Sequence, residues 1–318
     1  MMPEPELAFV ASATGAASAR RGERIQSLWS GYGELFRVHL EGGSVPSVVV
    51  KAVRPPRSSR SSRDDASHRR KCRSYEIEAT FYRTLARRCD DACRVPGLFA
   101  SRIADGDIDL VLEDLDASGF PRRRRGATPR EMDRCLSWLA ALHACFLGER
   151  PVGLWEVGTY WHLATRADEL AAMDDDELRR AAPILDERLR HARFQTIVHG
   201  DAKLANFCFP EGEGGVAAVD FQYVGGGPGV KDVAYLLSGH FEDDALERRA
   251  LDVYFAELRR ALTARGREED VDTLEAEWRA LYPIACADFY RFLAGWAKEH
   301  FRSDPHARAV VRRVLATL

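Results

Sequence analysis

The chain has 318 residues, of which 46% are hydrophobic and 30% charged, and its formal net charge is −3 at pH 7. This composition is typical of a globular protein with one large domain or two lobes that each have a core. The small net charge predicts no nucleic-acid partner. No apolar run approaches the ~20 residues of a membrane span, so we also expect no membrane partner.

The cysteines indicate a reducing compartment. There are seven of them, an odd number, at scattered positions, which argues against a disulfide framework and predicts a cytoplasmic protein with reduced thiols. The apolar segment 7–19 follows Glu4 and Glu6 instead of basic residues, so we do not interpret it as a signal peptide.

An antiparallel meander is predicted at the beginning of the chain. Alternating or β-branched residues predict strands over 24–29, 35–40 and 47–53. Turns rich in glycine and serine separate these strands. The first turn carries Gly31 and Gly33, where backbone N–H groups can approach phosphate oxygens because glycine has no side chain.

Lys51 lies inside the third predicted strand, within Val48-Val49-Val50-Lys51-Ala52-Val53. Burying an ammonium group without a partner is costly. The lysine therefore either points outward from an edge strand or has an acidic partner and a function. The helix predicted over 74–87 offers Glu76 and Glu78 as such partners.

Two basic segments interrupt the predicted elements. Residues 54–73 carry eight Lys or Arg and five Ser against two Asp. A segment this polar buries too little apolar surface to order itself, so we predict a mobile loop. The four arginines of 122–125 are interpreted as a solvated connection.

The chain becomes helical after a further strand. Residues 108–112 predict that strand, which runs into Glu113-Asp114-Leu115. Thr128-Pro129 has the pattern of a helix start, and an amphipathic helix is predicted over 132–147. Most of 155–193 is also expected to be helical. Several helices are predicted over 242–317, with core-like spacing of Trp278, Tyr282, Phe289, Tyr290, Phe292 and Trp296.

The most informative segment is His199-Gly200-Asp201-Ala202-Lys203-Leu204-Ala205-Asn206, followed by Asp220-Phe221-Gln222. Short apolar strands are predicted on both sides, over 196–198, 207–209 and 216–219. Packing does not explain carboxylates in such a loop. Carboxylate and amide oxygens are hard ligands that suit Mg²⁺, and phosphoryl transfer depends on positioning and charge neutralisation.

These motifs, in this order, resemble the kinase-like phosphotransferases: aminoglycoside phosphotransferases, choline kinases and, closest, the ecdysteroid-kinase-like proteins. The resemblance extends from residue 24 to nearly the end of the chain. It implies an α+β, protein-kinase-like fold of two lobes. Residues 1–114 would form a nucleotide-binding lobe of antiparallel sheet plus helix, and residues 115–318 a mainly helical catalytic and substrate lobe.

The resemblance also implies ATP and Mg²⁺ as cofactors. Asp201 would be the catalytic base. Lys203 would either contact the transferred phosphoryl group or simply be solvated. Asn206 and Asp220 would hold the metal ion.

Nucleotide contacts follow from the same resemblance. Lys51 would anchor phosphates, braced by Glu78, because Glu78-Ala79-Thr80-Phe81-Tyr82 is similar to the Glu-x-x-Phe-Tyr run of ecdysteroid-kinase-like proteins. The turn with Gly31 and Gly33 takes the place of a glycine-rich phosphate loop. Adenine would pair with backbone groups near Glu113 to Leu115.

Three further features would support the catalytic loop. His199 is implied to brace it, and Asp232 to organise it from the N-cap of a helix. His143 is interpreted as a structural core histidine. The run 225–229 is considered too flexible for a strand and replaces a long activation segment.

The sequence therefore predicts an ATP-dependent small-molecule kinase that transfers the γ-phosphoryl group to a hydroxyl of a hydroxylated acceptor. Two alternatives stay open. A protein kinase is disfavoured by the short activation segment, and a catalytically inactive pseudokinase gains no support because all the expected catalytic residues are present.

Overall fold

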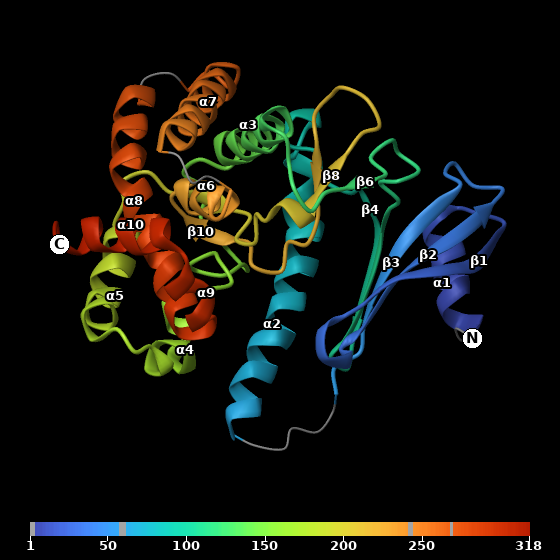
Figure 1. The fold of residues 1–318 in the computed structure, drawn as a ribbon. Coiled ribbons are helices and arrows are strands. Elements are labelled where there is room, and N and C mark those ends of the chain that lie inside the picture. Colours follow the sequence, from blue (N-terminus) through green and yellow to red (C-terminus); the bar gives the residue numbers. More distant parts are fainter. Residues whose placement is uncertain (1–3, 57–61, 241–243, 268–269) are drawn as a thin grey trace. The chain divides into compact units, whose positions relative to one another are not determined.

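The computed structural model describes residues 4–56, 62–240, 244–267 and 270–318 (Figure 1). The chain divides into two compact units. Unit 1 comprises Met1–Arg124 and Cys208–Gln222, and unit 2 comprises Arg125–Phe207 and Tyr223–Leu318. The boundary that we expected between residues 114 and 115 stays a prediction.

Unit 1 is built on a five-stranded antiparallel sheet with the strand order β1-β2-β3-β5-β4. Its strands are β1 (Ser18–Ser27), β2 (Gly33–Glu41), β3 (Ser47–Val53), β4 (Leu98–Ala104) and β5 (Asp107–Glu113). The predicted meander is present as β1 to β3. The prediction placed its first strand too late, because Trp29 belongs to a 3-10 helix, η1 (Trp29–Gly31), which follows β1.

Helix α1 (Glu4–Thr14) supplies apolar side chains to a core on the sheet. Val10 of α1 packs in this core with Phe36 and Val38 of β2 and with Val48 and Val50 of β3. Residues 48, 50 and 52 point to this face because side chains alternate along a strand. Lys51 therefore points to the opposite face.

Helix α2 (Ser62–Thr84) corrects the prediction of a loop over 54–73. The predicted helix begins twelve residues earlier than expected, at Ser62, and residues 57–61 lie outside the described part of the chain. The apolar part of α2 is buried, with Tyr75 and Phe81 almost fully covered. Extending an existing helix fixes one residue for each new hydrogen bond, so the buried end supports the polar end.

Two short 3-10 helices, η2 (Ala86–Arg88) and η3 (Asp91–Cys93), follow α2. A small sheet then joins β6 (Arg122–Arg123), β8 (Phe207–Phe209) and β9 (Ala217–Ala218) in the order β6-β8-β9. The interpretation of 122–125 as a plain solvated connection is thus wrong at β6. Its backbone pairs with β8, and the Arg123 side chain binds Asp116 at 3.0 Å.

Unit 2 is mainly helical. Its helices are α3 (Pro129–Cys145), α4 (Ala167–Ala172), α5 (Asp176–Arg190), α6 (Val230–Leu237), α7 (Asp244–Thr263), α8 (Val271–Trp296), α9 (Lys298–Ser303) and α10 (Pro305–Leu315), with 3-10 helices η4 (Leu163–Thr165) and η5 (Leu204–Asn206). No helix in the described ranges is long and apolar enough to cross a membrane. The α+β class, with an antiparallel sheet first and helices after it, is confirmed.

Helix α3 begins where the Thr-Pro pattern predicted. The Thr128 side chain accepts a hydrogen bond from the Glu131 backbone N–H, and the Glu131 carboxylate accepts one from the Thr128 backbone N–H. This reciprocal capping satisfies two N–H groups that the helix cannot bond internally. By contrast, residues 155–162 are irregular, so the prediction of mostly helix over 155–193 is correct only for its later part.

The aromatic residues of α8 are buried with one exception. Trp278, Phe289 and Phe292 are at most 4% exposed, whereas Trp296 is 61% exposed. Trp296 is the last residue of the helix. The helical spacing placed it on the apolar face, but only the indole face toward Phe292 is covered, through a stacked contact with ring centroids 5.5 Å apart.

The run 225–229 was expected to be too flexible for a strand, and this expectation is wrong. Gly225–Gly227 forms strand β10, which pairs antiparallel with β7 (Thr196–Val198). A Cβ on Gly225 would lie 2.3 Å from the Trp155 carbonyl oxygen. The glycines are therefore explained by the close approach of a neighbouring backbone.

Candidate active site

An ion pair in unit 1 joins the sheet to helix α2. The Lys51 ammonium on β3 donates to the Glu78 carboxylate on α2 at 2.6 Å, and their side chains are only 7% and 2% exposed. Burial alone would lower the pKa of Lys51, but the charges of Glu78 and Asp220 raise it above its ordinary value. The lysine is thus held as an ammonium ion.

Helix geometry explains why Glu78 is the partner and Glu76 is not. Glu78 lies one turn from both Tyr75 and Tyr82, on the buried face of α2. Glu76 is exposed and pairs with Arg73 at 3.1 Å. The choice between the two glutamates was made on a motif, and the structure places Glu78 against Lys51.

Asp220 is fixed next to this pair. Its carboxylate accepts hydrogen bonds from Lys51 at 3.5 Å and from the Gln222 amide at 2.8 Å. Ser74 of α2 donates to the same Gln222 at 3.1 Å. Asp220 adopts a φ of 71°, a left-handed conformation that is uncommon for a residue with a side chain.

The residue after Asp220 anchors the segment. The Phe221 ring stacks on Phe81 of α2 with centroids 4.0 Å apart. The Asp-Phe-Gln segment is thus tied to α2 by a hydrogen bond through Gln222 and by ring packing through Phe221. The sequence pointed to Asp220 but gave no role to Gln222 or Ser74, because their contact joins residues 148 positions apart.

The predicted glycine turn has a packing explanation. Gly31 and Gly33 have positive φ values of 77° and 133°. A Cβ on Gly33 would lie 2.0 Å from the Ala52 carbonyl oxygen, so glycine is required for the turn to approach β3. This requirement holds with or without a bound nucleotide.

The segment predicted to bind adenine lies at the end of β5. The Glu113 N–H donates to the Gly97 carbonyl at 2.8 Å, and the Leu115 carbonyl accepts from the Phe120 N–H, also at 2.8 Å. The Leu115 side chain is buried with Cys208 and Ala217. Within the described residues, the Leu115 N–H has no internal partner.

Unit 2 carries the loop with Asp201. The Asn206 amide donates to the Asp201 backbone carbonyl at 2.8 Å and to its carboxylate at 3.0 Å. The Lys203 ammonium, on a side chain 45% exposed, lies 2.9 Å from the same carboxylate. The structure therefore brings these three predicted residues together, with Asp201 in the middle.

Asp232 organises the backbone of this loop. Its carboxylate accepts hydrogen bonds from the His199 N–H at 2.6 Å and the Gly200 N–H at 2.9 Å. His143 bonds the same carboxylate at 3.1 Å and Tyr254 at 2.8 Å. Asp232 is the third residue of α6 and not its N-cap, which is Gly229, so that part of the prediction is wrong.

Two tyrosines next to Asp201 were missed by the sequence analysis. Burial and the Asp201 charge raise the pKa of Tyr235. Burial also raises the pKa of Tyr160, whose ring contacts that of Tyr235 with centroids 5.3 Å apart. Both phenols therefore stay protonated. Tyr235 stands in the Asp-x-Ala-Tyr-Leu run, but nothing in that run shows which side chain it meets.

The donor chemistry of Asn206 and Asp220 suits Mg²⁺. The Asn206 nitrogen donates to Asp201, so its amide oxygen is not used in that contact. Asp220 is 33% exposed and carries a carboxylate. Mg²⁺ usually keeps several waters and needs only one or two protein oxygens. The described ranges contain no cluster of three or more His, Cys, Asp or Glu that could hold a metal ion.

Comparison with known proteins identifies the family of the chain. A sequence profile of the Phosphotransferase enzyme family matches residues 24–271. Since the match covers most of the chain, the chain belongs to this family, and the predicted resemblance to kinase-like phosphotransferases is confirmed. The closer resemblance to ecdysteroid-kinase-like proteins stays a prediction.

Solved structures share the kinase-like fold. One is a Haemophilus somnus protein provisionally assigned as a fructosamine-3-kinase, with 14% identity over 98% of this chain and 96% of that chain and a TM-score of 0.51. Another is an ethanolamine kinase of Plasmodium vivax, with 12% identity over 99% of this chain and 85% of that chain and a TM-score of 0.51. No curated protein gives a significant sequence match.

Proposed function

We propose that this phosphotransferase is an ATP-dependent small-molecule kinase that transfers the γ-phosphoryl group to a hydroxyl of its acceptor. The observation that carries the proposal is the arrangement at Asp201. Its carboxylate is oriented by Asn206, and its loop is held by Asp232 through two backbone N–H groups. A fixed carboxylate of this kind suits a base that orients an attacking hydroxyl.

Asp201 accepts the proton of the acceptor hydroxyl as that oxygen bonds to the γ-phosphorus, while the bond from the γ-phosphorus to the β,γ-bridging oxygen breaks and ADP leaves with that electron pair. The carboxylate is held in place by the Asn206 amide, which donates to it at 3.0 Å. Lys203 is close enough to Asp201 to form an ion pair and exposed enough to move. We assign it the role of a point charge for the transferred phosphoryl group.

The nucleotide is assigned to residues of unit 1. The Lys51 ammonium binds phosphate oxygens and is held for that task by Glu78. The Leu115 N–H serves as the backbone donor for adenine, because the neighbouring Glu113 N–H is already bonded. Asp220 of unit 1 and Asn206 of unit 2 would each offer an oxygen ligand to Mg²⁺, and the bound ion would neutralise phosphate charge.

A screen with γ-labelled ATP and a panel of hydroxylated metabolites tests the proposal. We expect Asp201→Asn to lower kcat by about 10²- to 10⁴-fold, the usual contribution of a general base, with ATP binding retained. Glu187→Gln, on the exposed surface of α5, is the matched control and should leave kcat unchanged.

Undiminished transfer by Asp201→Asn would refute the assigned mechanism. If proteins in a lysate were labelled and no small hydroxylated compound were, the acceptor would be a protein and the proposal of a small-molecule acceptor would be wrong. A loss of kcat in Asp201→Asn is distinguished from a folding defect if the far-UV circular dichroism of the variant matches that of the wild type.

A further inference from the structure

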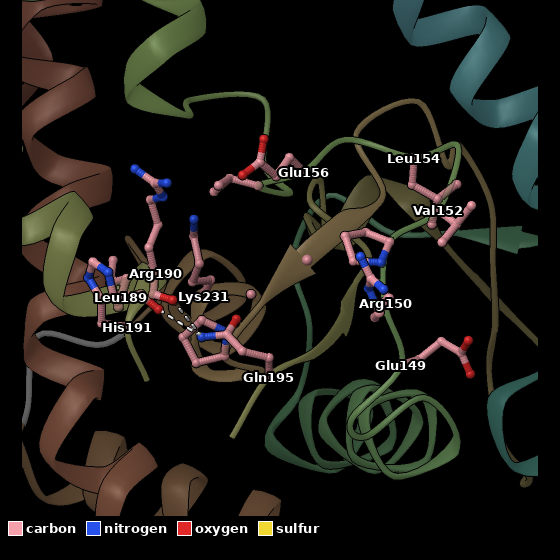
Figure 2. Close-up of a pocket in the computed structure, with 15 residues that line it drawn as sticks. Glu149, Arg150, Val152, Leu154, Glu156, Leu189, Arg190, His191, Gln195 and Lys231 are labelled. Carbon is pink, nitrogen blue, oxygen red and sulfur yellow. Dashed lines mark hydrogen bonds between the residues drawn. The ribbon is translucent and has the colours of Figure 1, made fainter. Parts of the chain in front are cut away.

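Unit 2 contains a cavity that is lined by none of the proposed catalytic residues. Its volume is about 510 Å³, and it lies among the segments 149–157, 189–195 and 226–231 (Figure 2). These belong to the chain after α3, the end of α5, and the passage from β10 into α6. Asp201, Lys203 and Asn206 are not part of its wall.

Lys231 is the unusual member of this wall. Its side chain is 1% exposed, and among the described residues its ammonium makes no hydrogen bond or ion pair. Figure 2 draws it extending in the same direction as the Arg190 side chain. An ammonium buried without a partner is costly, so its presence in a cavity wall calls for an explanation.

The carboxylates near Lys231 do not supply that partner. Asp288 accepts hydrogen bonds from Arg291 at 2.6 Å and Trp161 at 3.1 Å. Asp186 lies 3.6 Å from His162 and 3.9 Å from Arg190. Asp232 is bonded to the loop backbone. Consistent with an unpaired ammonium, burial lowers the pKa of Lys231, although Asp288 and Asp186 oppose the decrease.

The position of Lys231 in its helix adds to the attraction for an anion. It is the second residue of α6, an eight-residue helix whose N-cap, Gly229, provides no capping side chain. The N-terminal end of a helix carries partial positive charge. The ammonium and the helix end therefore favour the same sign of ligand.

The remaining wall indicates what kind of anion fits. Most of it is apolar, from Pro151, Val152, Leu154, Val157, Leu189 and Pro228. Arg150 and Arg190 add positive charge, and Glu149 and Glu156 add negative charge. With Lys231 there is one positive charge in excess. Gln195, also in the wall, donates its amide to carbonyls at the end of α5, so it is not available to a ligand (Figure 2).

We propose that this cavity binds a small monocarboxylic acid, with its carboxylate paired to the Lys231 ammonium and its apolar body against Val152 and Leu154. The volume is within the range of roughly 300 to 1,000 Å³ typical of small-molecule sites. The single excess charge favours a monoanion over a doubly charged phosphate. Because it is lined by none of the proposed catalytic residues, the site is separate from the proposed kinase reaction.

Benzoate is the probe that tests this site, with benzamide as its neutral counterpart and ionic strength held constant with sodium chloride. Binding is followed by calorimetry and by the Tm, neither of which requires ATP. We expect saturable binding of benzoate to the wild type and none of benzamide. Lys231→Met keeps the length of the side chain and should weaken benzoate binding at least tenfold.

Lys298→Met is the matched control, because Lys298 is a partly exposed lysine that pairs with Asp174 and lies outside the cavity wall. It should bind benzoate like the wild type. If Lys231→Met does not fold, acetic anhydride labelling of the wild type provides the second test: benzoate should protect Lys231 from acetylation and leave Lys298 unprotected.

Several results would overturn the site. These are equal benzoate binding by Lys231→Met and wild type, equal binding of benzamide, or acetylation of Lys231 that benzoate does not slow. Binding of inorganic phosphate without benzoate would overturn the assignment of an apolar acid. None of these results would affect the proposed kinase function, since no readout depends on phosphoryl transfer.

Discussion

Glu78 and Glu76 are expected to contribute differently to stability, because Glu78 pairs with the buried Lys51 whereas Glu76 pairs with the exposed Arg73. Glu78→Gln removes the negative charge at 2.6 Å from the buried ammonium and leaves the longer ion pair with Asp220 at 3.5 Å. Breaking a buried ion pair in this way costs on the order of 3 kcal/mol. We therefore expect a decrease of that size in the free energy of unfolding, measured with urea, and weaker ATP binding.

Glu76→Gln is the matched control on the same helix. Its pair with Arg73 is solvent-exposed, with side chains 53% and 45% exposed. Pairs of this kind contribute roughly 0 to 1 kcal/mol, so stability and ATP binding should change little. A larger effect of Glu76→Gln than of Glu78→Gln would show that the ion pair has been assigned to the wrong glutamate.

At the scale of residues, the sequence predicted the groups that recur in a motif and missed those that reach them from elsewhere. The contacts of Asp201 with Lys203 and Asn206 join residues of one six-residue segment, so a local sequence motif can predict them. Tyr235 is distant along the chain from Asp201, whose charge acts on its phenol. Packing decides such pairs, and no local pattern encodes it.

At the scale of elements, strand β10 depends on the absence of side chains. In Gly225→Ala the new Cβ would lie 2.3 Å from the Trp155 carbonyl oxygen and 2.8 Å from the Gly158 nitrogen. Overpacking of this kind typically costs roughly 1 to 3 kcal/mol. We expect a loss of stability in that range on urea denaturation.

Gly126→Ala is the control for that substitution. A Cβ at Gly126 would meet no atom within 4 Å, and its φ is not in the left-handed region. Replacement there should be neutral or slightly stabilising, because alanine restricts the unfolded chain. If Gly225→Ala were as stable as Gly126→Ala, the close approach of the Trp155 segment to β10 would be wrong.

The errors of prediction at this scale have a common cause. Composition predicted flexibility for the glycines of β10 and for the polar beginning of α2, yet both are regular elements. In each case a neighbouring part of the fold determines the conformation: a backbone that leaves room only for glycine, or a buried helix end that continues outward. Where capping residues or strand alternation determine an element locally, as at α3 and β3, prediction and structure agree.

At the scale of the whole molecule, the two units contain buried ionisable groups whose pKa values are shifted in opposite directions. In unit 1, the charges of Glu78 and Asp220 raise the pKa of Lys51 and keep its ammonium charged across the neutral range. In unit 2, burial and the charge of Lys231 lower the pKa of His162 from 6.5 to about 4. The folded protein therefore holds His162 neutral at pH values where the unfolded chain protonates it.

This difference predicts acid sensitivity. Between pH 6.5 and about 4 the unfolded chain binds a proton at His162 that the folded chain excludes, so the free energy of unfolding falls as the pH falls through this window. One proton corresponds to about 1.4 kcal/mol per pH unit, which gives a total on the order of 3 kcal/mol. In His162→Gln the slope of stability against pH should be shallower by about this one proton.

Urea denaturation at several pH values from 4 to 7 measures the two slopes. His300→Gln, at an exposed position on α9, should retain the slope of the wild type. If the carboxylates alone caused the acid sensitivity, wild type and His162→Gln would have parallel curves, and His162 would be excluded as the cause. Curves whose separation is constant above pH 6.5 and changes by about 3 kcal/mol between pH 6.5 and about 4 would instead identify His162 as the group that unfolding protonates.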